Sequence, residues 1–256
     1  MMLTACDGSD EDDPEKLAAK NEPVDVLYSK AETTFSGHNY KNATEQFEEV
    51  ERQHPYSEWA ARAQIMAAYS AYLGGQFDDA LVILDRFVKL HPTHPSTPYA
   101  YYLTALCYYT QISDVGRDQK MSEKARGALK EVVERYPDSD YAKDAQLKYE
   151  LTEDHLAGKE MEIGRYYQKR LDYAAAVNRY KYVIDNYQTT SHVPEALHRL
   201  VECYLHLGVV PEAKKYAAVL GYNYPGSDWY KYSYEMLQGN LTPEEKKSTF
   251  DKYLKF

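Results

Sequence analysis

Residues 80–92 read Ala-Leu-Val-Ile-Leu-Asp-Arg-Phe-Val-Lys-Leu-His-Pro, and this stretch decides the fold. Ala80, Leu84 and Phe87 follow one another at intervals of four and three residues, which places them on one face of a helix. Pro92 cannot donate a backbone hydrogen bond, so the helix ends before it. The stretch therefore predicts an amphipathic helix with a small residue, two large apolar residues and a proline stop.

The same spacing of four, three and five residues recurs along the chain. The further copies are Ala43, Phe47, Val50 and Pro55; Ala125, Leu129, Val132 and Pro137; Ala176, Tyr180, Val183 and Gln188; and Ala213, Ala217, Leu220 and Pro225. Glycines at 37, 74–75 and 208 fall where a helix preceding such a copy would end. Because one helix pair cannot bury its apolar face alone, the copies predict a stack of helix pairs.

This pattern resembles the second helix and closing proline of tetratricopeptide repeats. The preceding helices carry the small and aromatic positions of that family, as in Ile163, Gly164 and Tyr167, where the small residue lets the second helix approach closely. We expect an all-α tetratricopeptide-repeat superhelix (an α-solenoid) of five helix pairs, in two halves joined by a long helix.

Unequal spacing of the copies predicts the domain organisation. The third copy has extra residues within Thr110–Met121, which read as a loop, and the fourth has extra residues that keep a helical pattern over 140–170, with Gly158 as a point where that helix kinks or divides. The expected segments are a leash at 1–23, repeats one to three at 24–139, the long helix with repeats four and five at 140–227, and a capping helix with a tail at 228–256.

Composition limits the function. The chain has 256 residues and a formal net charge of −10, which disfavours a nucleic-acid binder because phosphate backbones need a basic face. No apolar run approaches the ~18 residues of a membrane-spanning helix. Leu3-Thr4-Ala5-Cys6 matches a bacterial lipobox, and the acidic segment after it is typical of an extended leash. The alternative for the lipobox is a chance match, because no charged and apolar signal segment precedes it.

The sequence offers no catalytic signature. It lacks a Walker loop, GxSxG, HExxH and GxGxxG, so we expect no enzymatic activity and no cofactor other than a covalent lipid on Cys6. His91 and His94 are three residues apart, but flanking prolines break the helix that would align them, and further ligands are missing nearby. We therefore expect no metal site.

Aromatic residues provide the candidate binding surface. Tyrosine is abundant, with 27 residues, and many of these tyrosines occupy packing positions of the repeats. The others lie on first helices or junctions, which line the concave face of such solenoids: Tyr56, Trp59, Tyr69, Tyr72, Tyr99 and Tyr102. We predict that several of them form a groove for an extended peptide, the alternative being further repeat packing.

The chain also resembles a narrower family, that of BamD, the lipoprotein component of the outer-membrane β-barrel assembly machinery. The resemblance rests on residues 85–95 (Asp-Arg-Phe-Val-Lys-Leu-His-Pro-Thr-His-Pro), on Tyr136-Pro137-Asp138-Ser139-Asp140-Tyr141 and on Ala176-Val177-Asn178-Arg179. The short insert at 111–119 is similar to the α-proteobacterial branch. The lipobox and the enlarged third repeat agree with this assignment.

The resemblance implies a function. The chain would be anchored by acyl chains on Cys6 to the periplasmic face of the outer membrane, beside other lipoproteins of the machinery. Its C-terminal repeats would bind the POTRA domain of BamA, with Arg179 at the contact. Its N-terminal repeats, with Arg86 added to the aromatic groove, would receive the C-terminal signal peptides of unfolded outer-membrane proteins. The alternative is another cell-envelope tetratricopeptide adaptor lipoprotein, linked to pili or division.

Overall fold

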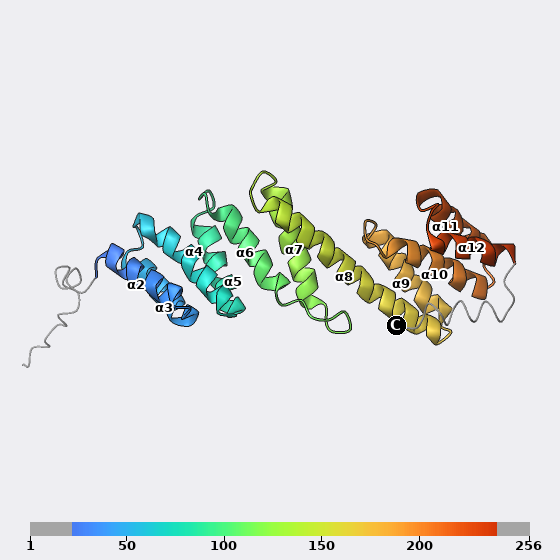
Figure 1. Cartoon of the computed structure of the whole chain (residues 1–256), viewed down its shortest axis with the longest axis horizontal. Helices are drawn as coiled ribbons and strands as arrows, with labels where there is room; N and C mark the ends of the chain where they lie inside the picture. Colours follow the sequence, from blue (N-terminus) through green and yellow to red (C-terminus); the bar gives the residue numbers. More distant parts are fainter. Residues whose placement is uncertain (1–21, 240–256) are drawn as a thin grey trace, which may run out of the picture. The chain divides into compact units, whose positions relative to one another are not determined.

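The structure is a computed structural model that describes residues 22–239, and these residues form helices joined by turns and loops (Figure 1). The contacts divide it into two units. The first comprises residues up to Thr110 together with Glu134–Ala142, and the second comprises Gln111–Val133 together with the residues from Lys143 onward. Of the leash predicted at 1–23, only residues 22 and 23 are described, and the tail from 240 onward lies outside the described residues.

The first unit consists of consecutive antiparallel helices. They are α2 (Val24–Ser36), α3 (Tyr40–Gln53), α4 (Glu58–Leu73), α5 (Phe77–Leu90) and α6 (Thr97–Tyr109), and each packs on the next. Helix α4 buries a row of alanines against its neighbours, which lets the helices approach closely. Phe47 and Phe87 belong to the same core cluster and are fully buried.

The second unit contains the remaining helices. They are α7 (Lys120–Arg135), α8 (Ala142–Lys169), α9 (Tyr173–Asn186), α10 (Val193–His206), α11 (Val210–Asn223) and the capping helix α12 (Asp228–Gln238). Helix α7 belongs to this unit except for its last two residues, whereas the repeat pattern groups it with the helices before it. The loop expected within Thr110–Met121 joins α6 to α7. Helix α8 is the expected long helix, and it continues without interruption through Gly158.

The repeat positions predicted from the sequence form the core. The alanine and the two following positions of all five copies are at most 6% exposed. Gly164 has the expected packing function, because a Cβ there would lie 2.5 Å from Cε1 of Tyr180. The prediction of an all-α fold built from tetratricopeptide-type helix pairs is confirmed.

Four of the turns between paired helices share one geometry, the Schellman motif. At Leu171, the backbone N–H donates to the carbonyl of Gln168 (2.9 Å), and the N–H of Asp172 donates to the carbonyl of Tyr167 (3.0 Å). The same two bonds recur at the turns after α2, α4 and α10. The left-handed position in the four turns holds His38 (φ 59°), Gly75 (φ 73°), Leu171 (φ 64°) and Gly208 (φ 75°). After α2 it is therefore His38, and not the expected Gly37, that has the left-handed conformation.

Candidate partner-binding sites

Four tyrosines of the first unit lie against one another, and we call them the aromatic cluster: Tyr69, Tyr99, Tyr102 and Tyr141. The ring centroids of Tyr69 and Tyr99 are 6.5 Å apart. Tyr141 lies 5.3 Å from Tyr99 and stacks on Tyr102 at 5.2 Å. On the other side, Phe35 lies 5.8 Å from Tyr69. All four tyrosines are half-buried, so part of each side chain remains exposed.

Helix spacing positions the aromatic cluster. Tyr99 and Tyr102 are three residues apart on α6 and therefore point to the same side. Burial, reinforced by the neighbouring phenols of Tyr69 and Tyr141, raises the pKa of Tyr99 above its ordinary value. Its phenol thus stays neutral at physiological pH. Partly exposed aromatic rings suit the aromatic side chains of an extended peptide.

The other predicted aromatic residues lie differently. Tyr72 borders the aromatic cluster, contributes to the raised pKa of Tyr99 and shares a 3.2 Å hydrogen bond with the hydroxyl of Thr110. Trp59 packs toward α2, where its ring lies 4.7 Å from that of Tyr28. Tyr56 is fully exposed on the loop before α4. The structure therefore brings four of the six predicted aromatic residues together, and their binding function stays a prediction.

Tyr141, which contacts both Tyr99 and Tyr102, was not among the predicted aromatic residues. It precedes α8 by one residue and belongs to the first unit. Its position in the Tyr136–Tyr141 segment was noted only as part of the family resemblance. The feature of the sequence that could have indicated Tyr141 is its position four residues after Pro137, the proline of the third copy, in the segment that leads into α8.

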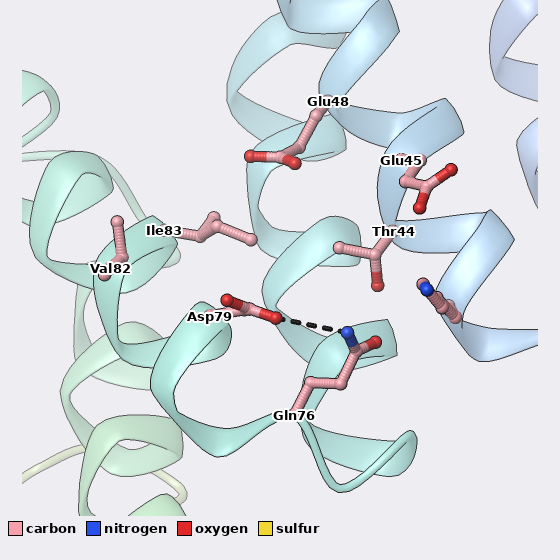
Figure 2. Close-up of a pocket in the computed structure, with 8 residues that line it drawn as sticks. Thr44, Glu45, Glu48, Gln76, Asp79, Val82 and Ile83 are labelled. Carbon is pink, nitrogen blue, oxygen red and sulfur yellow. Dashed lines mark hydrogen bonds between the residues drawn. The ribbon is translucent and has the colours of Figure 1, made fainter.

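Arg86 faces α3 and is held by carboxylates. Its Nη2 lies 2.8 Å from Glu51 Oε2 and 3.3 Å from Glu48 Oε1. Glu48 also lines a pocket of about 280 Å³ between α3 and α5 (Figure 2). Its polar lining combines the carboxylates of Glu45, Glu48 and Asp79 with Lys41, Thr44 and Gln76, and the side chain of Gln76 donates to Asp79 (3.1 Å). This polar pocket differs in chemistry from the aromatic cluster, and the predicted contact of Arg86 with a peptide stays a prediction.

Arg179 forms an ion pair across two helices of the second unit. Its Nη1 on α9 lies 3.0 Å from Oε2 of Glu160 on α8. The side chain of Arg179 is 42% exposed and that of Glu160 is 18% exposed. Part of the guanidinium is thus accessible to a second carboxylate, because arginine has five N–H donors.

A buried polar network in the second unit was not predicted. Arg199 on α10 is 1% exposed, and its Nη1 lies 2.8 Å from Oε2 of Glu202. Gln168 donates to the same carboxylate (3.0 Å) and accepts from the hydroxyl of Tyr180 (2.7 Å). His198 shares a 2.8 Å hydrogen bond with Ser233 of α12. The sequence of α10 did not indicate that its charged residues are buried, because charged residues are almost always exposed.

Electrostatics maintain the charges in this network. Burial alone would raise the pKa of Glu202, but the charges and hydrogen bonds of Arg199 and His198 outweigh it and hold that pKa below its ordinary value. Arg199 also lies 5.6 Å from the ring of Trp229, so the network joins α10 to the capping helix.

The remaining predictions about sites concern Cys6 and metals. Cys6 lies outside the described residues. His91 and His94 pack against Phe87, with ring centroids 5.1 and 5.6 Å from it. Within residues 22–239, no group of three or more potential metal ligands comes together. No helix in the same range has both the length and the apolar character needed to cross a membrane.

Comparisons with known proteins give consistent results. The model of the YfiO family, described as outer membrane lipoprotein, matches residues 20–220. The chain is 50% identical over 224 residues to the outer membrane protein assembly factor BamD of Caulobacter vibrioides, covering 88% of this chain and 73% of the relative. It is 47% identical over 216 residues to BamD of Rickettsia prowazekii, covering 84% and 86%, respectively.

Among solved structures, the TPR domain of P58(IPK) matches with a TM-score of 0.45 and 17% identity, covering 93% of this chain and 66% of that one. TTC0263, a thermophilic TPR protein of Thermus thermophilus, matches with a TM-score of 0.38 and 19% identity, covering 84% and 100%. The family match spans most of the chain, and the first relative is half identical to it. The chain therefore belongs to the BamD (YfiO) family of outer membrane lipoproteins.

Proposed function

We propose that the chain is a non-catalytic scaffold subunit of the outer-membrane β-barrel assembly machinery, anchored by lipid on Cys6 at the periplasmic face. The observation that carries this proposal is the 50% identity to a BamD assembly factor over nearly the whole chain. Stacked helix pairs suit such a function because they offer extended surfaces to several partners.

The second unit would dock the POTRA domain of BamA through Arg179. Support comes from the half-exposed guanidinium, which Glu160 holds in one orientation. A carboxylate of the partner would share this guanidinium, and such charge-assisted bonds combine strength with directional specificity. Because the arginine is already oriented, little side-chain entropy is lost on docking.

Charge reversal tests the docking site. Arg179→Glu should abolish co-purification with BamA from detergent-solubilised envelopes, since it faces both Glu160 and the partner carboxylate with a like charge. Arg52→Glu is a matched control, because Arg52 is also exposed and paired with a neighbouring glutamate, but in the first unit. Undiminished recovery of BamA by the Arg179→Glu chain would remove Arg179 from the interface.

The first unit would receive the C-terminal signal peptide of a client at the aromatic cluster. Support comes from the mutual contacts of Tyr69, Tyr99, Tyr102 and Tyr141 and from their partial exposure. An aromatic pair contributes about 1 kcal/mol beyond its buried area, so removing one ring should weaken binding roughly fivefold or more.

Fluorescence anisotropy of a labelled peptide tests this binding site. The peptide carries the last strand of an outer-membrane protein, and its affinity is measured for Tyr102→Ala and for Tyr222→Ala, a control at a highly exposed tyrosine of α11. We expect weaker binding only for Tyr102→Ala. Equal affinities of the two variants would argue against the aromatic cluster as the peptide site, while leaving the BamA contact open to its own test.

A further inference from the structure

The turns of repeats four and five expose aliphatic side chains along one edge of the second unit. Leu171 is 66% exposed in the turn between α8 and α9. In the turn between α10 and α11, Leu207, Val209 and Val210 are 44%, 39% and 42% exposed. We call these four residues, with Lys169 and Arg170, the turn edge. The corresponding turns of the first unit hold Gly37-His38-Asn39 and Gly74-Gly75-Gln76.

Leu171 has a backbone conformation that leucine rarely adopts. It occupies the left-handed position of a Schellman motif, where the second and fifth repeats have glycine. A residue with a Cβ costs about 1–2 kcal/mol in that conformation, and leucine has no side-chain hydrogen bond to offset it. An exposed leucine in strained backbone gains nothing for folding. Such a conflict between local preference and structure is expected where a side chain serves binding.

The two turns lie side by side. The rings of Tyr173, at the start of α9, and His206, at the end of α10, stack with centroids 4.5 Å apart and an interplanar angle of 3°. Helices α9 and α10 pack against each other (Figure 1). The turn before α9 and the turn after α10 therefore lie at the same end of this helix pair, with the exposed aliphatic residues of both.

Cations flank these aliphatic residues although the chain as a whole is acidic. Lys169 and Arg170 immediately precede Leu171, and Lys214 and Lys215 follow on the first turns of α11; all four are exposed. Two acidic residues lie among these four cations: Asp172 accepts from the backbone N–H of Ala175 (3.2 Å), and Glu212 lies 3.6 Å from Lys215. The positive charges therefore still outnumber the negative ones. The turn edge thus combines apolar contacts with local positive charge in a chain of net charge −10.

We propose that the turn edge docks on an anionic phospholipid surface. Aliphatic side chains that insert among acyl chains, with lysine and arginine at headgroup level, are the two components of interfacial binding. The attraction acts within a Debye length of ~10 Å, so the distant acidic residues do not cancel it. This contact is independent of the lipid on Cys6 and of docking to BamA, and it would hold the second unit against the membrane.

Vesicle co-sedimentation tests the proposal. The probe is vesicles of phosphatidylcholine with or without phosphatidylglycerol, and the protein is the full chain carrying Cys6→Ser, so that no acyl anchor contributes. We expect binding only to phosphatidylglycerol vesicles, weakened by salt. Leu171→Gly should lower the partition coefficient about tenfold, equivalent to about 1.4 kcal/mol or less than two inserted CH₂ groups.

Leu171→Gly separates binding from folding. Glycine suits the left-handed position, so the thermal midpoint should be unchanged or higher. His38→Gly, at the same position of the first repeat, is the matched control and should bind vesicles like the unsubstituted chain. Val209→Ser provides a second variant within the turn edge, and Lys169→Glu tests the charge; both should weaken binding.

Three results would overturn the proposal: no binding of the unsubstituted chain to phosphatidylglycerol vesicles, equal binding with and without phosphatidylglycerol, or equal binding by Leu171→Gly and His38→Gly. If Leu171→Gly leaves vesicle binding unchanged but loses co-purifying envelope proteins, the turn edge is a protein interface and not a membrane contact.

Discussion

Replacing Arg199 by methionine should destabilise the second unit far more than any change at a surface charge. The substitution preserves most of the side-chain volume but leaves Glu202, which is 3% exposed, without its 2.8 Å partner. Breaking one side of a buried ion pair costs about 3–5 kcal/mol. Arg179→Met is the matched control, because Arg179 also pairs with a glutamate but is half-exposed, and it should cost about 1 kcal/mol or less.

The two tryptophans allow each unit to be followed separately. Trp59 lies in the first unit, whereas Trp229 lies in the second, 5.6 Å from Arg199. With Trp59→Phe as background, urea unfolding followed by Trp229 fluorescence reports the free energy of unfolding of the second unit. With Trp229→Phe as background, Trp59 should show that Arg199→Met leaves the first unit unchanged.

A double substitution distinguishes loss of the charge pair from loss of packing. Arg199→Met combined with Glu202→Leu removes both charges and should recover most of the lost stability, since apolar residues often replace buried pairs without cost. If Arg199→Met costs no more than Arg179→Met, the network does not contribute to stability as argued. If the double variant is as unstable as the single one, packing and not uncompensated charge dominates.

The same network predicts a dependence on pH. The pKa of Glu202 is lower in the folded chain than in the unfolded chain, so the unfolded state takes up the proton first as the pH falls. The stabilisation is therefore present above the ordinary carboxyl pKa of about 4.5 and is lost progressively below it. Glu202→Gln should flatten the acid limb of the stability profile measured with Trp229, and an unchanged slope would contradict this.

Two further predictions concern packing and thiol chemistry. Gly164→Ala should destabilise the second unit by about 1–3 kcal/mol in urea unfolding, because the new Cβ would lie 2.5 Å from the ring of Tyr180. Gly127→Ala is the control, and it should stabilise the protein by about 0.5–1 kcal/mol because the space around Gly127 is open. Equal effects of the two substitutions would contradict the packing argument. Cys107 should resist a thiol reagent in the folded chain at pH 8, because burial raises its pKa to about 12. Cys203, whose pKa is also raised by burial, should behave likewise. Rapid labelling of Cys107 without urea would show that the first unit opens.

Much of the fold followed from spacing. Positions such as Ala80, Leu84 and Phe87 recur because a helix pair must bury one stripe, so their register predicted burial at every copy. The long helix was predicted for the same reason, but its continuity through Gly158 was not. A glycine inside a helix costs only about 1 kcal/mol, and a Cβ at Gly158 would lie 3.3 Å from Nε2 of His192, so the missing side chain leaves room for that ring.

The candidate sites were less predictable than the core. Tyr69, Tyr99 and Tyr102 were selected because first helices line one face, but Tyr141 reaches them from a connecting segment whose path no periodicity describes. Arg199 and Glu202 look like ordinary surface residues in the sequence. Their burial depends on α8, α9 and α12 packing around α10, and this arrangement of segments far apart in the chain has no local signal.

The division into units has a consequence for how this protein can be dissected or recombined. The chain crosses from one unit to the other at 110/111, at 133/134 and again at 142/143. No single break in the backbone therefore yields two complete parts. A split between 139 and 140 leaves Tyr141 with the wrong fragment and α7 without the helices of its own unit. Exchange of one unit between relatives would have to replace two separate segments at once, so the two units are expected to have diversified together rather than as interchangeable modules.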